Sequence, residues 1–332
     1  MNDSTQTTKR ELIVFFVVAF GVPYLMGIPL AISQRAGNDT SSFANAQMFY
    51  PAAGVMLAFL LTHRPNLPLR FYAVHLVTTV ACLVTGLLSV IFPSAQTWAV
   101  VDSWMIIIAS IFAWVLLLTE KKEKRSPYGL RWQGKGSIAL GICLLFLLLE
   151  TIMMFVSIGL EGKEALWAYW GYWNTIFPWL NLFAVILSFF VSFLPFLGEE
   201  YSWRYYLTPL FQKRFGKRRG VLLIGVLWGL WHLPLNLFFY SPETSLQSIV
   251  IQIVVCITLG VFFTFGYEVS GHNIWVPVLL HYLNNNMILV WSGTANVGNQ
   301  IYTWTDIGIS AVLYGVLFLP FLATKVFQEK KT

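Results

Sequence analysis

Ten long apolar stretches limit this chain to folds that place most of its residues among lipid tails. The stretches cover residues 12–33, 43–62, 72–93, 98–118, 136–158, 176–195, 219–240, 246–267, 274–293 and 304–325. Each is close to the ~20 residues that a helix needs to cross a bilayer. Only 11% of the residues are charged, against about 25% in soluble domains. We therefore predict an all-α fold, a polytopic transmembrane helical bundle of about ten transmembrane helices in the cell membrane.

The basic residues predict how this bundle is oriented. Most of them lie in the N-terminus, in alternate connections or in the C-terminal tail: Lys9, Arg10, Arg64, Arg70, Lys121, Lys122, Lys124, Arg125, Arg131, Lys135, Lys213, Arg214, Lys217, Arg218, Arg219, Lys325, Lys330 and Lys331. The opposite connections hold only Arg35 and Lys163. The positive-inside rule then places both termini in the cytoplasm. The net charge of +6 follows from this topology, so we expect no nucleic-acid partner.

Polar breaks divide the chain into two parts. A basic connection at 120–135 separates an N-terminal part, residues 1–135 with about four helices, from a C-terminal part, residues 136–332. A second cytoplasmic segment is expected at 196–219, where Pro195 and Gly198 would bend or interrupt a helix. The cysteines at 82, 143 and 256 lie in apolar stretches and are expected to be small core residues. The first stretch lacks a signal-peptide cleavage site and is expected to remain as the first transmembrane helix.

The adjacent acids Glu199 and Glu200 are the strongest functional signal in the C-terminal part. A carboxylate costs roughly 2.5–3.5 kcal/mol to insert at the centre of a membrane helix, so an intramembrane pair is a candidate functional site. On a helix, Glu200 and Arg204 are four residues apart and suited to an ion pair, whereas Glu199 points about 100° away. The alternative interpretation is a solvated ion pair just outside the membrane.

Two further polar groups lie deep in apolar stretches. His232 is about 20 Å along its helix when measured from Arg219. His281 and Asn285 are four residues apart, so both face one side of a helix and could bind an oxyanion. Each group could instead serve only as a structural hydrogen-bonding partner. Together with the glutamates they supply what direct attack of water on a carbonyl requires.

The order and spacing of these residues resemble a known family. Glu-Glu-x-x-x-Arg ends at Arg204, an aromatic-x-x-x-His motif runs from Trp228 to His232, and His-x-x-x-Asn runs from His281 to Asn285. These motifs, within residues 195–287, resemble the CAAX prenyl protease and bacteriocin-processing superfamily of intramembrane proteases. The resemblance implies a C-terminal catalytic core that cleaves a hydrophobic or lipid-anchored peptide at the bilayer. It also implies a bacterial cytoplasmic membrane, because the flanking residues look like those of bacterial members.

The resemblance also implies residue roles. Glu199 would be the general base and would activate water with His232, while Glu200 and Arg204 would hold the motif. His281 and Asn285 would form the oxyanion hole. Two positions depart from the family pattern. Trp228 stands where Phe is usual, which we expect to be harmless. Tyr205 replaces a small residue, which could narrow the site and alter the substrate.

Three alternatives remain open at this stage. No cofactor is expected, but zinc held by Glu199, His232 and His281 is the alternative to a metal-free mechanism. A proton- or ion-coupled transporter would use the buried polar residues His75, Asp102 and Glu150 as well. A non-catalytic scaffold or bacteriocin-immunity protein would keep the fold without the chemistry.

Overall fold

The computed structural model describes residues 3–94, 97–294 and 296–329. The fold is all-helical, with 83% of the residues in helices, and the described residues contain no strand. One hydrophobic core runs through the whole molecule, from Phe15 in the first helix to Phe318 in the last. The three cysteines are buried, as predicted.

The number of candidate spans is slightly lower than the sequence predicted. Seven described helices are long and apolar enough to cross a membrane, or up to nine if each of two bent pairs counts as one span. The bent pairs are Lys163–Trp173 with Phe177–Ser192, and Lys217–Trp231 with Leu233–Tyr240. The ninth predicted span, residues 274–293, corresponds to α16 (Trp275–Ser292), which is not among the candidates. His281 and three consecutive asparagines make α16 less apolar than the others, yet its core-facing side is buried.

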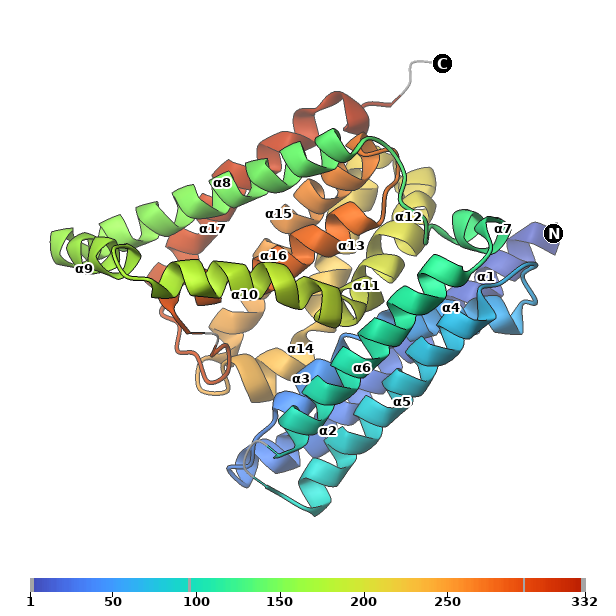
Figure 1. Cartoon of the computed structure of the whole chain (residues 1–332), viewed down its shortest axis with the longest axis horizontal. Helices are drawn as coiled ribbons and strands as arrows, with labels where there is room; N and C mark the ends of the chain where they lie inside the picture. Colours follow the sequence, from blue (N-terminus) through green and yellow to red (C-terminus); the bar gives the residue numbers. More distant parts are fainter. Residues whose placement is uncertain (1–2, 95–96, 295, 330–332) are drawn as a thin grey trace.

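The first six helices gather on one side of the molecule (Figure 1, blue to teal). They are α1 (Asp3–Phe16), α2 (Val22–Arg35), α3 (Ser41–Gln47), α4 (Tyr50–Leu61), α5 (Leu69–Ile91) and α6 (Thr97–Thr119). Helix α4 is central to this group and is mostly buried. A Cβ at its Gly54 would lie only 3.0 Å from the backbone oxygen of Phe15. Small residues let α4 and α1 approach closely, as is common between membrane helices.

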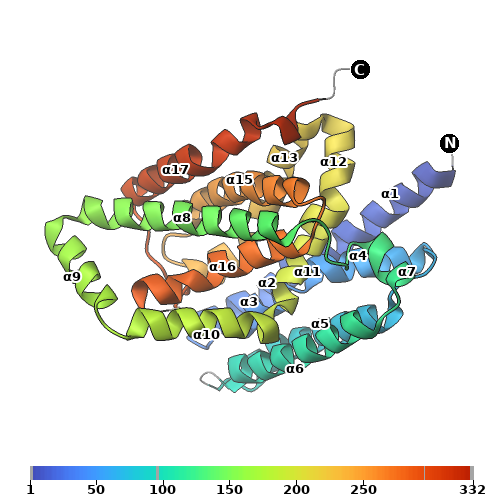
Figure 2. The same cartoon turned by 45° about the horizontal axis from the view of Figure 1, so that its top comes forward.

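Most of the remaining helices form the other side, with α11 between the two groups, whereas the short α7 lies beside α1 and α4 (Figures 1 and 2). The remaining helices are α7 (Lys122–Arg125), α8 (Gly136–Glu161), α9 (Lys163–Trp173), α10 (Phe177–Ser192), α11 (Leu194–Glu200), α12 (Thr208–Phe215), α13 (Lys217–Trp231), α14 (Leu233–Leu235), α15 (Ser245–Val269), α16 and α17 (Trp304–Phe318). Helix α13 packs tightly on α15. A Cβ at Gly225 or Gly229 would lie 2.5 or 2.7 Å from the α15 backbone, so this G-x-x-x-G pair fixes the contact.

The segment expected as a cytoplasmic connection is instead partly buried. Helix α11 begins after a break at Phe193, with Pro195 in its first turn, where proline is tolerated. Every residue of α11 is buried, and the helix continues into the π-helical segment η3 (Tyr201–Leu207). A Cβ at Gly198 would lie 2.4 Å from the Met48 carbonyl oxygen. Gly198 therefore lets α11 pack closely against the first six helices, which we call the front helices, and this packing places Glu199 and Glu200 in the interior.

The basic connections lie at one end of the bundle. The N-terminal end of α1, α7, α12 and the C-terminal end all point the same way in both views (Figures 1 and 2). Contacts join them: Arg64 Nε lies 2.7 Å from Glu11 Oε1, and the Lys217 backbone N–H donates to Glu329. The Glu11 hydrogen bond raises the pKa of Arg64. Which side of the membrane this end faces stays a prediction.

Candidate active site

The two adjacent glutamates end α11 in the interior of the bundle, between the two groups of helices. Glu199 is 2% exposed and Glu200 is fully buried. Their side chains leave the helix in different directions and meet different partners. This arrangement excludes the alternative of a solvated ion pair outside the membrane, because neither carboxylate reaches solvent.

Glu200 is surrounded by cationic or protonatable groups. Its Oε1 accepts a hydrogen bond from His281 Nδ1 at 2.9 Å, and its Oε2 lies 3.2 Å from Arg204 Nε. The Arg204 contact is not aligned for a hydrogen bond, so it acts through charge. The guanidinium carbon also lies 4.7 Å from the ring centre of Trp228 and 5.3 Å from that of Phe263. The predicted ion pair is therefore present, fully buried and supported by aromatic faces.

Among the described residues, Glu199 accepts hydrogen bonds only from neutral donors. Its Oε2 accepts from the indole N–H of Trp228 at 2.8 Å and of Trp203 at 3.4 Å. Among the described residues, no hydrogen bond reaches its Oε1. Trp228 was expected to be a harmless exchange, but a phenylalanine there could not donate this bond. The indole holds one carboxylate oxygen and leaves the other for a reacting group.

His232 stands at the C-terminal end of α13, next to the same indole. Its Nδ1 lies 2.9 Å from the Trp228 carbonyl oxygen. A carbonyl only accepts, so Nδ1 carries the proton and Nε2 of the neutral ring is an acceptor. The Trp228 ring centre is 6.1 Å from that of His232 and 5.3 Å from that of His281. Trp228 thus lies beside both histidines and Glu199.

Asn285 is the one predicted site residue without a hydrogen bond or ion pair to this group in the described part of the chain. It is exposed on α16, one turn beyond His281, and its Oδ1 accepts from Asn284 Nδ2 at 2.9 Å. Its role in an oxyanion hole stays a prediction. The zinc alternative does not fit the geometry. Within the part of the chain that the structure describes, no three His, Cys, Asp or Glu side chains are gathered as a metal ion requires.

Of the polar residues considered for a transporter, His75 lies beside α11, with its Cε1 3.4 Å from the position of a Cβ at Gly198. Asp102 accepts a bond from Thr85 at 2.5 Å, and His75 Nε2 lies 3.1 Å from the Phe49 carbonyl oxygen. Glu150 is 4% exposed on α8, and its Oε1 has no hydrogen-bond partner among the described residues. Two of the three therefore have the pairing role that buried polar groups usually serve.

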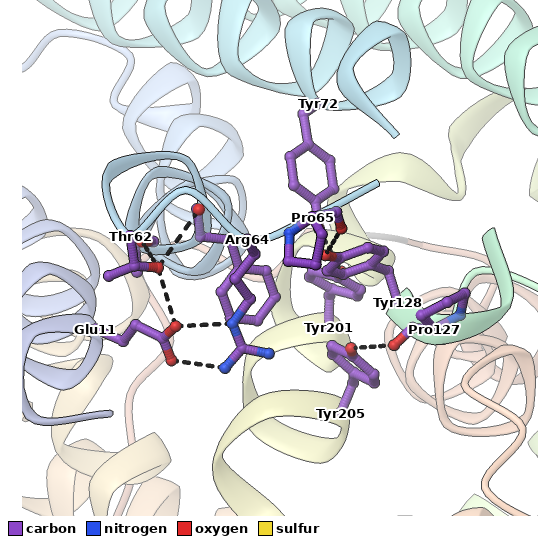
Figure 3. Close-up of polar contacts among 11 residues, drawn as sticks. Glu11, Thr62, Arg64, Pro65, Tyr72, Pro127, Tyr128, Tyr201 and Tyr205 are labelled. Atoms are coloured by element: carbon purple, nitrogen blue, oxygen red, sulfur yellow. Dashed lines mark hydrogen bonds and ion pairs between the residues drawn. The ribbon is translucent and has the colours of Figure 1, made fainter. Parts of the chain in front are cut away.

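Tyr205, the second departure from the family pattern, points away from the glutamates. Its hydroxyl donates to the Pro127 carbonyl at 2.8 Å, and its ring stacks on Tyr201 at 4.8 Å (Figure 3). The Tyr201 hydroxyl in turn lies 2.8 Å from that of Tyr72 on α5. The tyrosine therefore ties η3 to the 126–130 turn and does not narrow the site as the sequence suggested.

Comparisons with known proteins agree with this site. The family pattern described as "Type II CAAX prenyl endopeptidase Rce1-like" matches residues 178–287, which hold all six predicted site residues. A "CAAX prenyl protease 2" from Methanococcus maripaludis is 26% identical over 156 residues, covering 43% of this chain and 53% of that protein. The chain thus matches about half of that relative's length. Both matches support the CAAX protease superfamily that the motifs resemble. No solved structure matches significantly.

The CAAX protease pattern begins in α10 and ends in α16, so it leaves the front helices α1–α6 outside. Those helices nevertheless complete the site. Met48 lies against α11, and Trp203 packs edge-on against Phe15 with ring centres 6.2 Å apart. A sequence search limited to the family motifs could not reveal these contacts.

Proposed function

We propose that this protein is an intramembrane endopeptidase that hydrolyses a peptide bond with water activated by Glu199. The observation that carries the proposal is the contrast between two adjacent buried carboxylates. Glu200 is in direct contact with Arg204 and His281, whereas the hydrogen bonds to Glu199 from described residues come only from neutral indole N–H groups. A general base must exchange a proton, and the less compensated carboxylate suits that task.

In the proposed reaction, water lies between Glu199 and His232. Glu199 takes one proton as the water oxygen attacks the carbonyl carbon, and the neutral Nε2 of His232 accepts the second hydrogen bond. The carbonyl oxygen becomes an oxyanion in the tetrahedral intermediate. His281, in its doubly protonated form, donates Nε2–H to that oxyanion, with Asn285 as the second donor. Glu199 then passes its proton to the leaving nitrogen as the C–N bond breaks.

The substrate we propose is a hydrophobic or lipid-anchored peptide. A prenylated C-terminal peptide is the first choice, because the name of the archaeal relative specifies a CAAX prenyl protease. The site lies within a bundle whose outer surface is apolar. A lipid chain would keep such a peptide at the membrane and present its backbone to the interior. We further propose the bacterial cytoplasmic membrane as the location, with the site open to the cytoplasm.

The test compares hydrolysis of a farnesylated and an unmodified CAAX-type peptide by the purified full-length protein. Glu199→Gln keeps the Trp228 contact geometry but removes the base, so we expect a loss of at least ~100-fold in kcat. Glu150→Gln is the matched control, because it neutralises another buried glutamate, on α8. Its activity should stay within twofold of the wild type. Equal losses in both variants would contradict the proposal and favour a proton-coupled transporter.

A further inference from the structure

The end of α13 needs four hydrogen-bond donors, because the last four carbonyls of a helix have no partner in their own helix. In α13 these belong to Trp228, Gly229, Leu230 and Trp231. Normally the following residues or water supply donors. Here the chain bends by 41° into the next helix. Pro234 has no N–H to offer the Leu230 carbonyl, four residues earlier.

His232 satisfies the first two of these carbonyls itself. Its ring Nδ1 lies 2.9 Å from the Trp228 oxygen, and its backbone N–H donates to the Gly229 oxygen at 3.2 Å. The orientation of the His232 ring therefore depends on how α13 ends. If the bend became regular α-helix, the Trp228 carbonyl would accept from a main-chain N–H and would no longer fix the proton on Nδ1.

The other two carbonyls receive side chains from the front helices. Gln47, the last residue of α3, donates Nε2–H to the Trp231 oxygen at 2.9 Å. Tyr24 of α2 donates its hydroxyl to the Leu230 oxygen at 2.8 Å. Gln47 is 3% exposed, so water does not compete at that carbonyl. A Cβ at Gly27 would lie 3.3 Å from Pro234, so α2 is pressed against the bend itself.

We infer that Gln47 and Tyr24 are positioning residues that hold the end of α13 so that His232 presents Nε2 to the reacting water. The inference rests on the proposed function for the role of His232. It assigns a task to the front helices, which lie outside the region that matches the CAAX protease family. They supply hydrogen-bond donors to the last carbonyls of α13, which the chain that follows does not fully satisfy because Pro234 has no N–H.

The chemistry predicts what each substitution does. Gln47→Leu keeps the size of the side chain but leaves the Trp231 carbonyl without a donor in an apolar setting. The bend then rewinds to recruit a main-chain N–H, and the imidazole moves. Gln47→Glu can donate only when the introduced carboxyl is protonated, so its defect should be relieved as the pH falls. Tyr24→Phe should have a smaller effect, because Tyr24 is 40% exposed.

The experiment measures kinetics and histidine state in the same preparations. Full-length protein labelled with 15N-histidine is studied in detergent micelles, with the His232 signals assigned by their loss in His232→Gln. Peptide hydrolysis is measured with the farnesylated CAAX-type peptide. For Gln47→Leu we expect kcat to fall at least ~tenfold with KM within twofold, since small displacements in a site are costly. The His232 15N signals should change from those of a single tautomer to those of a mixture of the two neutral tautomers.

Asn181→Leu is the matched control. Asn181 Nδ2 also donates to a backbone carbonyl, that of Leu289 at 3.1 Å, but far from His232 in the chain. It should leave the His232 signals unchanged. An unaltered kcat in Gln47→Leu, or a fall in kcat with unchanged His232 signals, would overturn the inference. If the wild type cleaves no peptide, the proposed function fails, and the His232 signals alone decide whether Gln47 positions the ring.

Discussion

Breaking the buried ion pair of Glu200 and Arg204 should destabilise the protein far more than removing it whole. Both side chains are fully buried, with Nε and Oε2 3.2 Å apart. Removing one partner of such a pair costs about 3–5 kcal/mol, because a charge is left uncompensated. In Arg204→Met, His281 still lies 2.9 Å from Glu200, so we expect the lower end, about 3 kcal/mol.

Thermal unfolding in detergent micelles measures this effect. At about 2–4 °C per kcal/mol, Arg204→Met should lower Tm by roughly 6–12 °C. The double variant Glu200→Gln/Arg204→Met removes both charges and should lower Tm much less than Arg204→Met alone. Arg64→Met is the comparison: its partner Glu11 is buried, but Arg64 is 39% exposed, so water can take the place of the guanidinium and the loss should be smaller than in Arg204→Met. Additive losses in the double variant would refute the reasoning.

Two further outcomes are expected. Trp228→Phe removes the 2.8 Å bond to Glu199; because a hydrogen bond to a charged group contributes about 1.5–3 kcal/mol, peptide hydrolysis should slow by roughly 10- to 100-fold, and Tm should fall by roughly 3–12 °C. The hydrogen bond to Glu268 raises the pKa of His272 at the end of α15, so its NMR titration midpoint should lie above about 6.5 and return towards that value in Glu268→Gln. The stabilisation from this raised pKa is complete below the unfolded pKa and is lost as the pH rises through the folded one.

The helical membrane fold was readable from the sequence because apolar length is a direct physical requirement of the bilayer. The same rule failed at α16, where the residues that form the site lower the hydropathy of a helix that the bundle still buries. Residues 196–207 were expected to form a connection between helices, but they are largely buried. Pro195 and Gly198 were expected to bend or interrupt a helix, and a break does precede α11 at Phe193; the sequence did not indicate that Gly198 also permits a close approach to Met48.

The candidate site was readable only where local spacing carries the information. The Glu200–Arg204 pair follows from a separation of four residues on one helix. The partners of Glu199 and of the α13 carbonyls did not follow, because they depend on helices brought together by packing. Gln47 and Trp231 are 184 residues apart, and nothing in either local sequence indicates the other. Trp228 was judged by its ring alone, and its N–H was overlooked.

The division of labour between the two glutamates follows from how a helix directs neighbouring side chains. Consecutive residues point about 100° apart, so Glu199 and Glu200 enter different surroundings although they share one backbone. A guanidinium compensates a full charge in an apolar interior, whereas neutral indole N–H groups only solvate it. Glu200 therefore serves as the fixed anion that holds Arg204 and His281 in place. Exchanging the two roles would require the bundle to move a cation from one face of α11 to the other. Neither glutamate can therefore take over the role of the other in this fold. Glu199→Gln should lose hydrolysis but keep a normal Tm, whereas Glu200→Gln should lose hydrolysis and also have a lower Tm.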